Sequence, residues 1–123
     1  MSGAGLGADF FGIGGQGKSI VYVLDCSDSM NNDDRFRRAR EELIYSIEKL
    51  SREQSFYVIL YNDGAMPMDA DDPVPAVPEE FARLRTWLER AEPFGGTYPW
   101  PALEYALSLE PDAAAGCRRS TPR

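Results

Sequence analysis

Two continuous apolar runs are the clearest feature of the hydrophobic pattern along this chain. Residues 20–24 read Ile-Val-Tyr-Val-Leu, and residues 55–61 read Ser-Phe-Tyr-Val-Ile-Leu-Tyr. Both runs are rich in β-branched and aromatic side chains, and their length is typical of strands buried on both faces, as in parallel sheets. The pattern therefore predicts two central strands.

Between these runs, apolar side chains recur at helical spacing. Phe36, Leu43, Ile47 and Leu50 fit one face of an amphipathic helix that ends near residue 50. Several candidate N-cap side chains precede this helix at residues 31–34. We therefore predict a helix that connects the two strands.

The second half of the chain predicts two more helices. Pro78, followed by two glutamates, is a favourable helix start, and apolar side chains at helical spacing continue to residue 91. A third helix follows Pro99 and ends near Leu109. Before them, residues 62–64 (Asn-Asp-Gly) favour a tight turn into a short edge strand at residues 65–68. Residues 69–78, with three prolines and three acids, are expected to form a loop.

The resulting order is strand, helix, strand, short strand, helix, helix. This order predicts the α/β class, with a Rossmann-like, open, mostly parallel sheet and helices on both faces. We divide the chain into a Gly-rich lead-in at residues 1–18, a domain at residues 19–112 and an irregular tail at residues 113–123.

Composition narrows the classes of function. The net charge of −7 argues against binding to nucleic acid or to anionic membrane surfaces, both of which need clustered Lys and Arg. The chain has no histidine, which removes His-dependent triads and His-ligated zinc. The positions of Cys26 and Cys117 do not indicate a disulfide framework, so we expect reduced thiols. With no apolar run of about 18 residues and no secretory signal, a cytoplasmic location is the default expectation.

Candidate chemistry follows directly after the first apolar run. Asp25, Ser27 and Ser29 occupy alternate positions, so an extended segment would point all three the same way. Ligands gather beyond the carboxyl ends of strands in open α/β sheets, and carboxylate and hydroxyl oxygens suit Mg²⁺ or Mn²⁺. Thr97, after Gly95 and Gly96, could approach from a neighbouring loop at a helix start.

This pattern resembles the von Willebrand factor type A family and its metal ion-dependent adhesion site. The family motif, Asp-x-Ser-x-Ser with a later Thr, matches at Asp25, Ser27, Ser29 and Thr97. The resemblance covers about residues 19–111. It implies a metal site formed by these four residues and a non-enzymatic, metal-dependent protein-binding role. The expected partner is a protein that offers an acidic side chain to the metal.

The end of the chain departs from the family pattern. Family members carry a further strand that ends in Asp-Gly, whose aspartate completes the metal site. Asp112 stands before the expected position, and residues 113–117 (Ala-Ala-Ala-Gly-Cys) offer no apolar strand. We therefore expect a truncated or frame-shifted, partial domain with lower metal affinity. Its first strand would lose a neighbour and expose an edge, and a non-functional fragment stays open as an alternative.

A second alternative comes from a phosphate-loop motif. The segment from Gly12 to Ser19 satisfies Gly-x-x-x-x-Gly-Lys-Ser. In a nucleotide-binding protein, Lys18 would contact the phosphates, with Asp25 or Asp63 near Mg²⁺. A true phosphate loop follows a buried strand and opens a helix, whereas here a predicted strand follows the motif. We favour a flexible Gly-rich lead-in.

Overall fold

Two parallel strands form the centre of the sheet. The structure, a computed structural model, describes residues 10–13 and 19–109. Strand β2 (Ser19–Asp25) pairs in parallel with β3 (Ser55–Tyr61), with Ser19 opposite Ser55 and Asp25 opposite Tyr61. Apart from the ends of β2 and the first residue of β3, every residue of the pair is buried. Both predicted central strands are thereby confirmed.

Three shorter strands extend the sheet in antiparallel fashion. Strand β4 (Ala65–Pro67) pairs with β3, which confirms the predicted edge strand after the Asn-Asp-Gly turn. Strand β5 (Val74–Pro75) also pairs with β3, inside the segment predicted to be a loop. Strand β1 (Phe10–Ile13) pairs with the other side of β2. The strand order is β1-β2-β3-β4, with β5 beside β3.

Strand β1 corrects two expectations. Residues 10–13 were expected in an irregular lead-in, but they form a strand whose Phe10 is opposite Leu24 and whose Ile13 is opposite Val21. The expected exposed edge of β2 is therefore covered along these residues. The physical reason is that a buried strand with unpaired N–H and C=O groups gains stability from any extended segment within reach.

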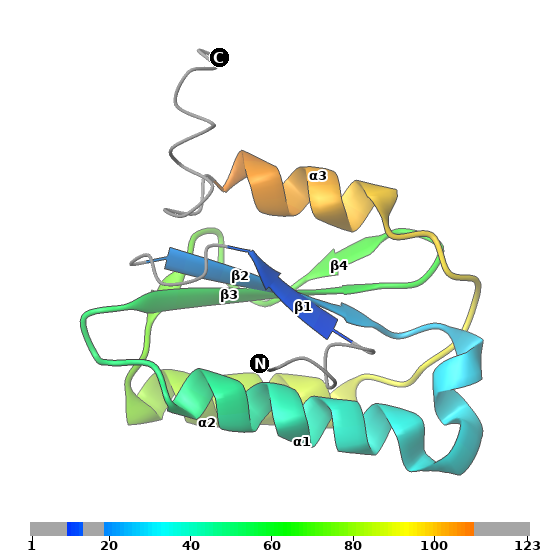
Figure 1. Cartoon of the computed structure of the whole chain (residues 1–123), viewed down its shortest axis with the longest axis horizontal. Coiled ribbons are helices and arrows are strands. Elements are labelled where there is room, and N and C mark those ends of the chain that lie inside the picture. The colour runs from blue at the N-terminus through cyan, green and yellow to red at the C-terminus, as the bar shows by residue number, and fades with distance from the viewer. Residues whose placement is uncertain (1–9, 14–18, 110–123) are drawn as a thin grey trace.

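Helices cover both faces of the sheet, as predicted. Helices α1 (Arg35–Glu48) and α2 (Pro78–Arg90) lie together on one face, and α3 (Trp100–Ser108) lies on the other (Figure 1). The two helices on the first face bury leucine and isoleucine side chains, whereas α3 buries only Ala102 and Ala106. Ring stacking adds to each face, with Phe81 against Phe56 and Tyr105 against Tyr57 at centroid distances of 5.9 and 6.0 Å.

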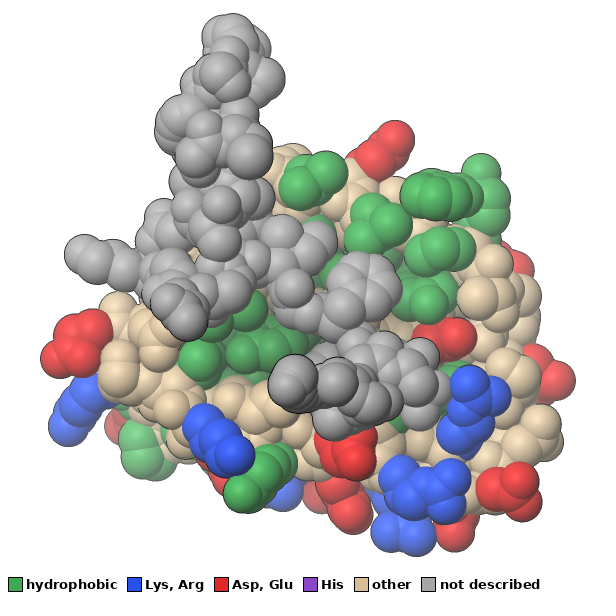
Figure 2. Space-filling view, in the orientation of Figure 1, with side chains coloured by type: hydrophobic (Ala, Val, Ile, Leu, Met, Phe, Trp, Pro, Cys, Tyr) green, Lys and Arg blue, Asp and Glu red, His purple; other side chains and the backbone are tan. Residues whose placement is uncertain are grey.

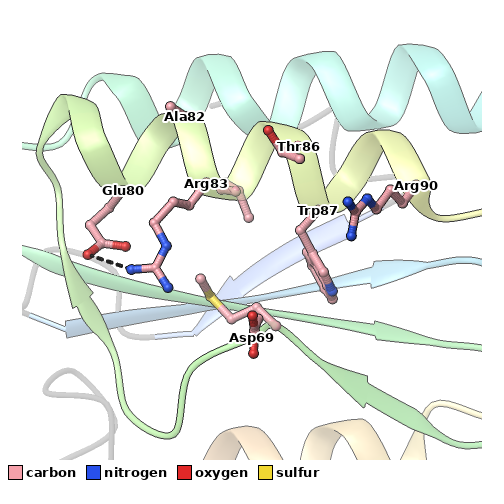
Figure 3. A pocket seen from close by; sticks show the side chains of 9 residues that line it. Asp69, Glu80, Ala82, Arg83, Thr86, Trp87 and Arg90 are labelled. Atoms are coloured by element: carbon pink, nitrogen blue, oxygen red, sulfur yellow. Dashed lines mark ion pairs between the residues drawn. The ribbon is translucent and has the colours of Figure 1, made fainter.

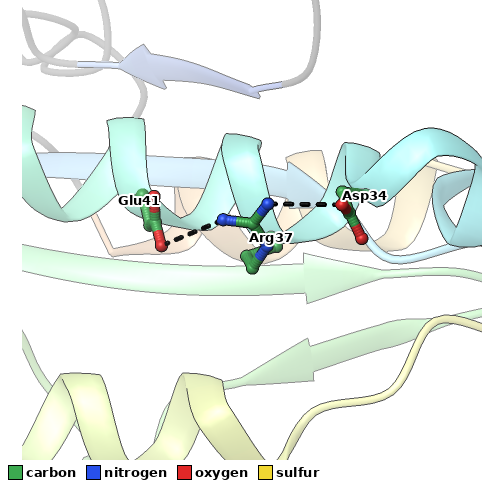
Figure 4. Close-up of polar contacts among 3 residues, drawn as sticks. All are labelled: Asp34, Arg37 and Glu41. Carbon is green, nitrogen blue, oxygen red and sulfur yellow. Dashed lines mark hydrogen bonds and ion pairs between the residues drawn. The ribbon is translucent and has the colours of Figure 1, made fainter.

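A 3₁₀ segment, η2 (Asp28–Asp34), separates the first strand from α1. It covers the residues predicted as N-caps, and Asp34 stands at the cap position but makes no side-chain cap hydrogen bond. Asp33 and Asp34 have positive φ angles of 52° and 58°, which few non-glycine residues adopt. Arg37 instead contacts Asp34 at 3.3 Å and Glu41 at 3.6 Å (Figure 4). These ion pairs are exposed, so they contribute little to stability.

Among the helices of the described residues, none has both the length and the apolar character needed to cross a membrane.

Candidate functional site

The first of the candidate residues stands where β2 ends. Asp25 is the last residue of β2, and its Oδ1 accepts a hydrogen bond from the backbone N–H of Ser27 at 2.8 Å. The Ser27 side chain is buried, that of Ser29 is exposed, and their hydroxyl oxygens lie 3.4 Å apart. The structure thus brings together the two serine hydroxyls of the motif.

The reason for this proximity differs from the one expected. Ser27 is extended, with φ −85° and ψ 171°, but the chain turns into η2 at Asp28. The two hydroxyls therefore meet across the first turn of η2, not along one face of an extended segment. The backbone N–H of Met30 donates to the carbonyl of Ser27 at 2.9 Å and closes this turn.

Cys26, the residue between Asp25 and Ser27 in the motif, is buried. Its side chain is 1% exposed, and its N–H donates to the carbonyl of Tyr61 at 2.8 Å, at the end of β3. Burial raises the pKa of the thiol to about 11, and the neighbouring Asp25 carboxylate adds to this effect. The thiolate form of Cys26 is therefore disfavoured, which argues against a nucleophilic role.

The loop that carries Thr97 runs beside the motif. The N–H of Phe94 donates to the carbonyl of Cys26 at 3.0 Å, and the N–H of Asp28 donates to the carbonyl of Gly95 at 2.9 Å. Thr97 is exposed and lies three residues before the first residue of α3, not at the helix start as expected. Its hydroxyl makes no hydrogen bond within the described part of the chain. Two backbone bonds therefore join the loops of the four candidate residues, without fixing the Thr97 side chain.

A third loop, predicted as a tight turn and considered for Mg²⁺ only through Asp63 in the nucleotide-binding alternative, completes this edge of the sheet. The turn after β3 is closed by the N–H of Asn62 donating to the carbonyl of Gly64 at 3.1 Å. The same turn holds the Thr97 loop, because the N–H of Tyr98 donates to the carbonyl of Asn62 at 2.9 Å. Asp63 accepts a further bond from the N–H of Gly96. The signal in the sequence was its position at the carboxyl end of the second central strand.

The carboxylate and hydroxyl oxygens of the four candidate residues are ligands of the kind that a hard divalent cation prefers. Mg²⁺ holds six oxygen ligands at about 2.1 Å in octahedral geometry, so neighbouring ligands stand about 3 Å apart. The 3.4 Å between the hydroxyls of Ser27 and Ser29 is close to that spacing. Within residues 10–13 and 19–109, no group of three or more His, Cys, Asp or Glu side chains could hold a metal. Among the four candidate residues, Asp25 supplies the one carboxylate, and Ser27, Ser29 and Thr97 supply hydroxyl oxygens.

The remaining residues named in the sequence fall into two groups. Gly12 lies in β1 and Ser19 is the first residue of β2, so the phosphate-loop motif connects two antiparallel strands and opens no helix. A phosphate loop opens a helix, whereas among the described residues a strand follows this motif. Asp112 and Cys117, with the expected irregular tail, lie outside the described residues, as does Lys18.

A separate hollow of about 330 Å³ lies between α2 and the segment after β4. Arg83 and Trp87 extend from α2 toward Asp69, and Glu80 pairs with Arg83 at 3.6 Å (Figure 3). Together with Arg90, the lining carries two acidic and two basic side chains. It therefore offers no net charge by which to select a ligand.

Comparisons with known proteins identify a similar fold among solved structures. No protein-family model matches the chain, and no curated protein has significant similarity to it. Among solved structures, the chain is similar to "von Willebrand factor type A from Catenulispora acidiphila", with a TM-score of 0.63 and 23% sequence identity. That similarity covers 68% of this chain and 20% of the other, so this chain spans about a fifth of its length. The described residues therefore have a von Willebrand factor type A-like fold.

Proposed function

We propose that this chain is a non-enzymatic protein-binding domain that uses a divalent cation, Mg²⁺ or Mn²⁺, held by Asp25, Ser27, Ser29 and Thr97. The observation that carries this proposal is the pair of serine hydroxyls at 3.4 Å, next to a carboxylate at the end of β2. The loop of Thr97 is tied by backbone hydrogen bonds to the loop of these residues.

The charge of the donor set favours binding over hydrolysis. When bound, a dication with one protein carboxylate and neutral hydroxyls stays electron-poor and attracts a carboxylate from outside the protein. A hydrolase would also need a positioned base. The chain has no histidine, and burial holds the thiol of Cys26, between Asp25 and Ser27, in its protonated form.

Exposed aromatic side chains support a protein as the partner. Phe94, Tyr98 and Trp100 surround Thr97 in the sequence, and each is more than half exposed. Hydrophobic side chains gather at the end of the molecule where α3 begins (Figure 2). Aromatic residues are enriched in protein–protein interfaces and in their energetic hot spots. An acidic partner side chain at the metal could thus be flanked by apolar contacts.

Thermal unfolding with and without metal tests the proposal. A cation that binds only the folded state stabilises it by about 2.7 kcal/mol at a concentration 100 times its Kd. We expect Mg²⁺ and Mn²⁺ to raise the Tm of the wild-type protein and of Asp69→Ala, which removes an exposed carboxylate away from the motif. Asp25→Ala should remove the metal effect. Equal Tm values with and without metal in the wild-type protein would contradict the proposal and favour a chain without this function.

A further inference from the structure

Asp63 makes a close contact with the two glycines that precede Thr97. Its Oδ1 accepts a hydrogen bond from the N–H of Gly96 at 2.9 Å. Asp63 stands in the turn between β3 and β4, whereas the glycines stand between α2 and α3. The contact therefore joins two loops that are 33 positions apart in the sequence.

The glycines are matched to this carboxylate. Gly95 has a φ of +82°, a conformation that side chains rarely adopt, and a Cβ there would lie 2.8 Å from Oδ2 of Asp63. A Cβ at Gly96 would lie 3.0 Å from Oδ1. Any side chain at position 95 would push the carboxylate away, so the Gly-Gly pair provides the space that Asp63 occupies.

Within the described residues, four hydrogen bonds hold residues 94–98 against the rest of this edge. Two of them join Phe94 and Gly95 to the backbone of Cys26 and Asp28, and one joins Tyr98 to the backbone of Asn62. The fourth is the bond from Gly96 to Asp63, and its acceptor is a side-chain oxygen. It acts on the residue directly before Thr97, where two adjacent glycines leave the backbone most free to move.

We propose that Asp63 is a positioning residue, which fixes the Gly95–Gly96 backbone and thereby sets where the Thr97 hydroxyl stands relative to Ser27 and Ser29. The importance of Thr97 rests on the function proposed above, whereas the hold on the glycine backbone does not. Asp63 itself is no ligand in this account, because both of its oxygens face the glycine pair.

Amide hydrogen exchange, followed by NMR, tests the hold on the backbone without any metal. Removing a hydrogen bond to a carboxylate in Asp63→Ala should speed exchange of the Gly96 amide about tenfold. Asp63→Asn keeps an acceptor oxygen and should restore much of the protection. Asp69→Ala, which removes an exposed carboxylate elsewhere, should leave Gly96 exchange unchanged. Equal Gly96 exchange in wild type and Asp63→Ala would overturn the proposal.

Titration with Mn²⁺ alone tests the consequence for the site. Asp63→Ala should weaken Mn²⁺ binding about tenfold, Asp63→Asn should weaken it less, and Asp69→Ala should match the wild type. A purely structural role would lower the Tm of Asp63→Ala but leave its Mn²⁺ affinity unchanged, and that result would overturn the positioning role. If the wild-type protein binds no Mn²⁺, the proposed function fails, and the Gly96 exchange rates still decide whether Asp63 holds this loop.

Discussion

The hydroxyl of Ser27 lies 3.4 Å from the hydroxyl of Ser29, although the first side chain is buried and the second is exposed. One oxygen is therefore fixed by the fold, and the other faces solvent next to it. The role of Ser29 can therefore be tested by mutation, because a change at this exposed position should leave folding unaffected.

Ser29→Ala should lower the affinity for Mg²⁺ or Mn²⁺ without changing stability. Loss of even an outer partner of a metal ligand costs about tenfold in affinity, so loss of a ligand should cost at least that much. The free energy of unfolding without metal should stay within about 0.5 kcal/mol of the wild-type value, because the side chain is exposed. Calorimetric titration and denaturant unfolding measure the two quantities. Ser108→Ala, an exposed serine on α3, is the control, and equal metal affinity of Ser29→Ala and wild type would remove Ser29 from the site.

Cys26 should make stability depend on pH in the alkaline range. Its folded-state pKa of about 11 lies above the ordinary value of 9.0, so the folded state binds the thiol proton more tightly than the unfolded state does. The resulting stability is complete below about pH 9 and is lost as pH rises through about 11. A shift of this size corresponds to about 3 kcal/mol. Burial also raises the pKa of Tyr22, to about 12, so part of the alkaline loss belongs to that residue.

Denaturant unfolding between pH 8 and pH 11 measures the contribution of Cys26. The comparison uses Cys117→Ser and the double variant Cys26→Ser/Cys117→Ser, so that one thiol is the only difference. The variant that retains Cys26 should lose more stability with rising pH. If the free energy of unfolding fell with pH equally in the two variants, the Cys26 thiol would have the same pKa in the folded and unfolded states. At pH 8, the retained thiol should react slowly with a disulfide reagent until the protein is unfolded.

The two central strands could be predicted from the sequence because burial on both faces requires continuous apolar runs. Residues 20–24 and 55–61 are apolar throughout because both of their faces are covered, and such runs have few alternatives to a buried strand. Strand β1 was not predicted because its four residues, Phe-Phe-Gly-Ile, are few and include a glycine. Its pairing depends on the open edge of β2, and the pattern of residues 10–13 alone does not reveal that edge. The 3₁₀ segment escaped prediction because residues with positive φ, Asp33 and Asp34, lie within it.

The candidate site likewise has a part that the sequence predicts and a part that it does not. The motif at Asp25 could be found because its residues are adjacent in the sequence and follow a strand. The role of Asp63 could not, because its contact with Gly95 and Gly96 depends on how two distant loops cross. A turn at the carboxyl end of a central strand indicates the correct edge of the sheet, but not which backbone amide it meets.

Strand β1 should protect the edge of β2. A variant that lacks residues 1–13 loses the four paired positions from Phe10 to Ile13, whereas a variant that lacks residues 1–9 keeps them. The longer deletion should lower the free energy of unfolding by on the order of 2 kcal/mol through lost strand pairing, and it should scatter more light as it aggregates. Identical unfolding and light scattering in the two variants would show that β1 does not cover this edge in solution.

Tyr57 should contribute more to stability than its stacking partner, Tyr105. The Tyr57 ring is fully buried and its hydroxyl donates to the carbonyl of Ala70, with the carbonyl of Met68 at 3.3 Å. Tyr57→Phe leaves these carbonyls without that donor, so we expect a loss of about 1–2 kcal/mol. The Tyr105 hydroxyl lies 3.4 Å from that of Tyr57 at a partly exposed position, so Tyr105→Phe should cost less.

A double-mutant cycle separates the two hydroxyls. If the contact between Tyr57 and Tyr105 matters, the double variant Tyr57→Phe/Tyr105→Phe should lose less stability than the sum of the single losses. Additive losses would mean that Tyr57 acts through the carbonyls after β4 alone. A loss in Tyr105→Phe as large as that in Tyr57→Phe would contradict the account, because it would place the main energetic contribution of this pair on α3 instead of on the segment between β4 and β5.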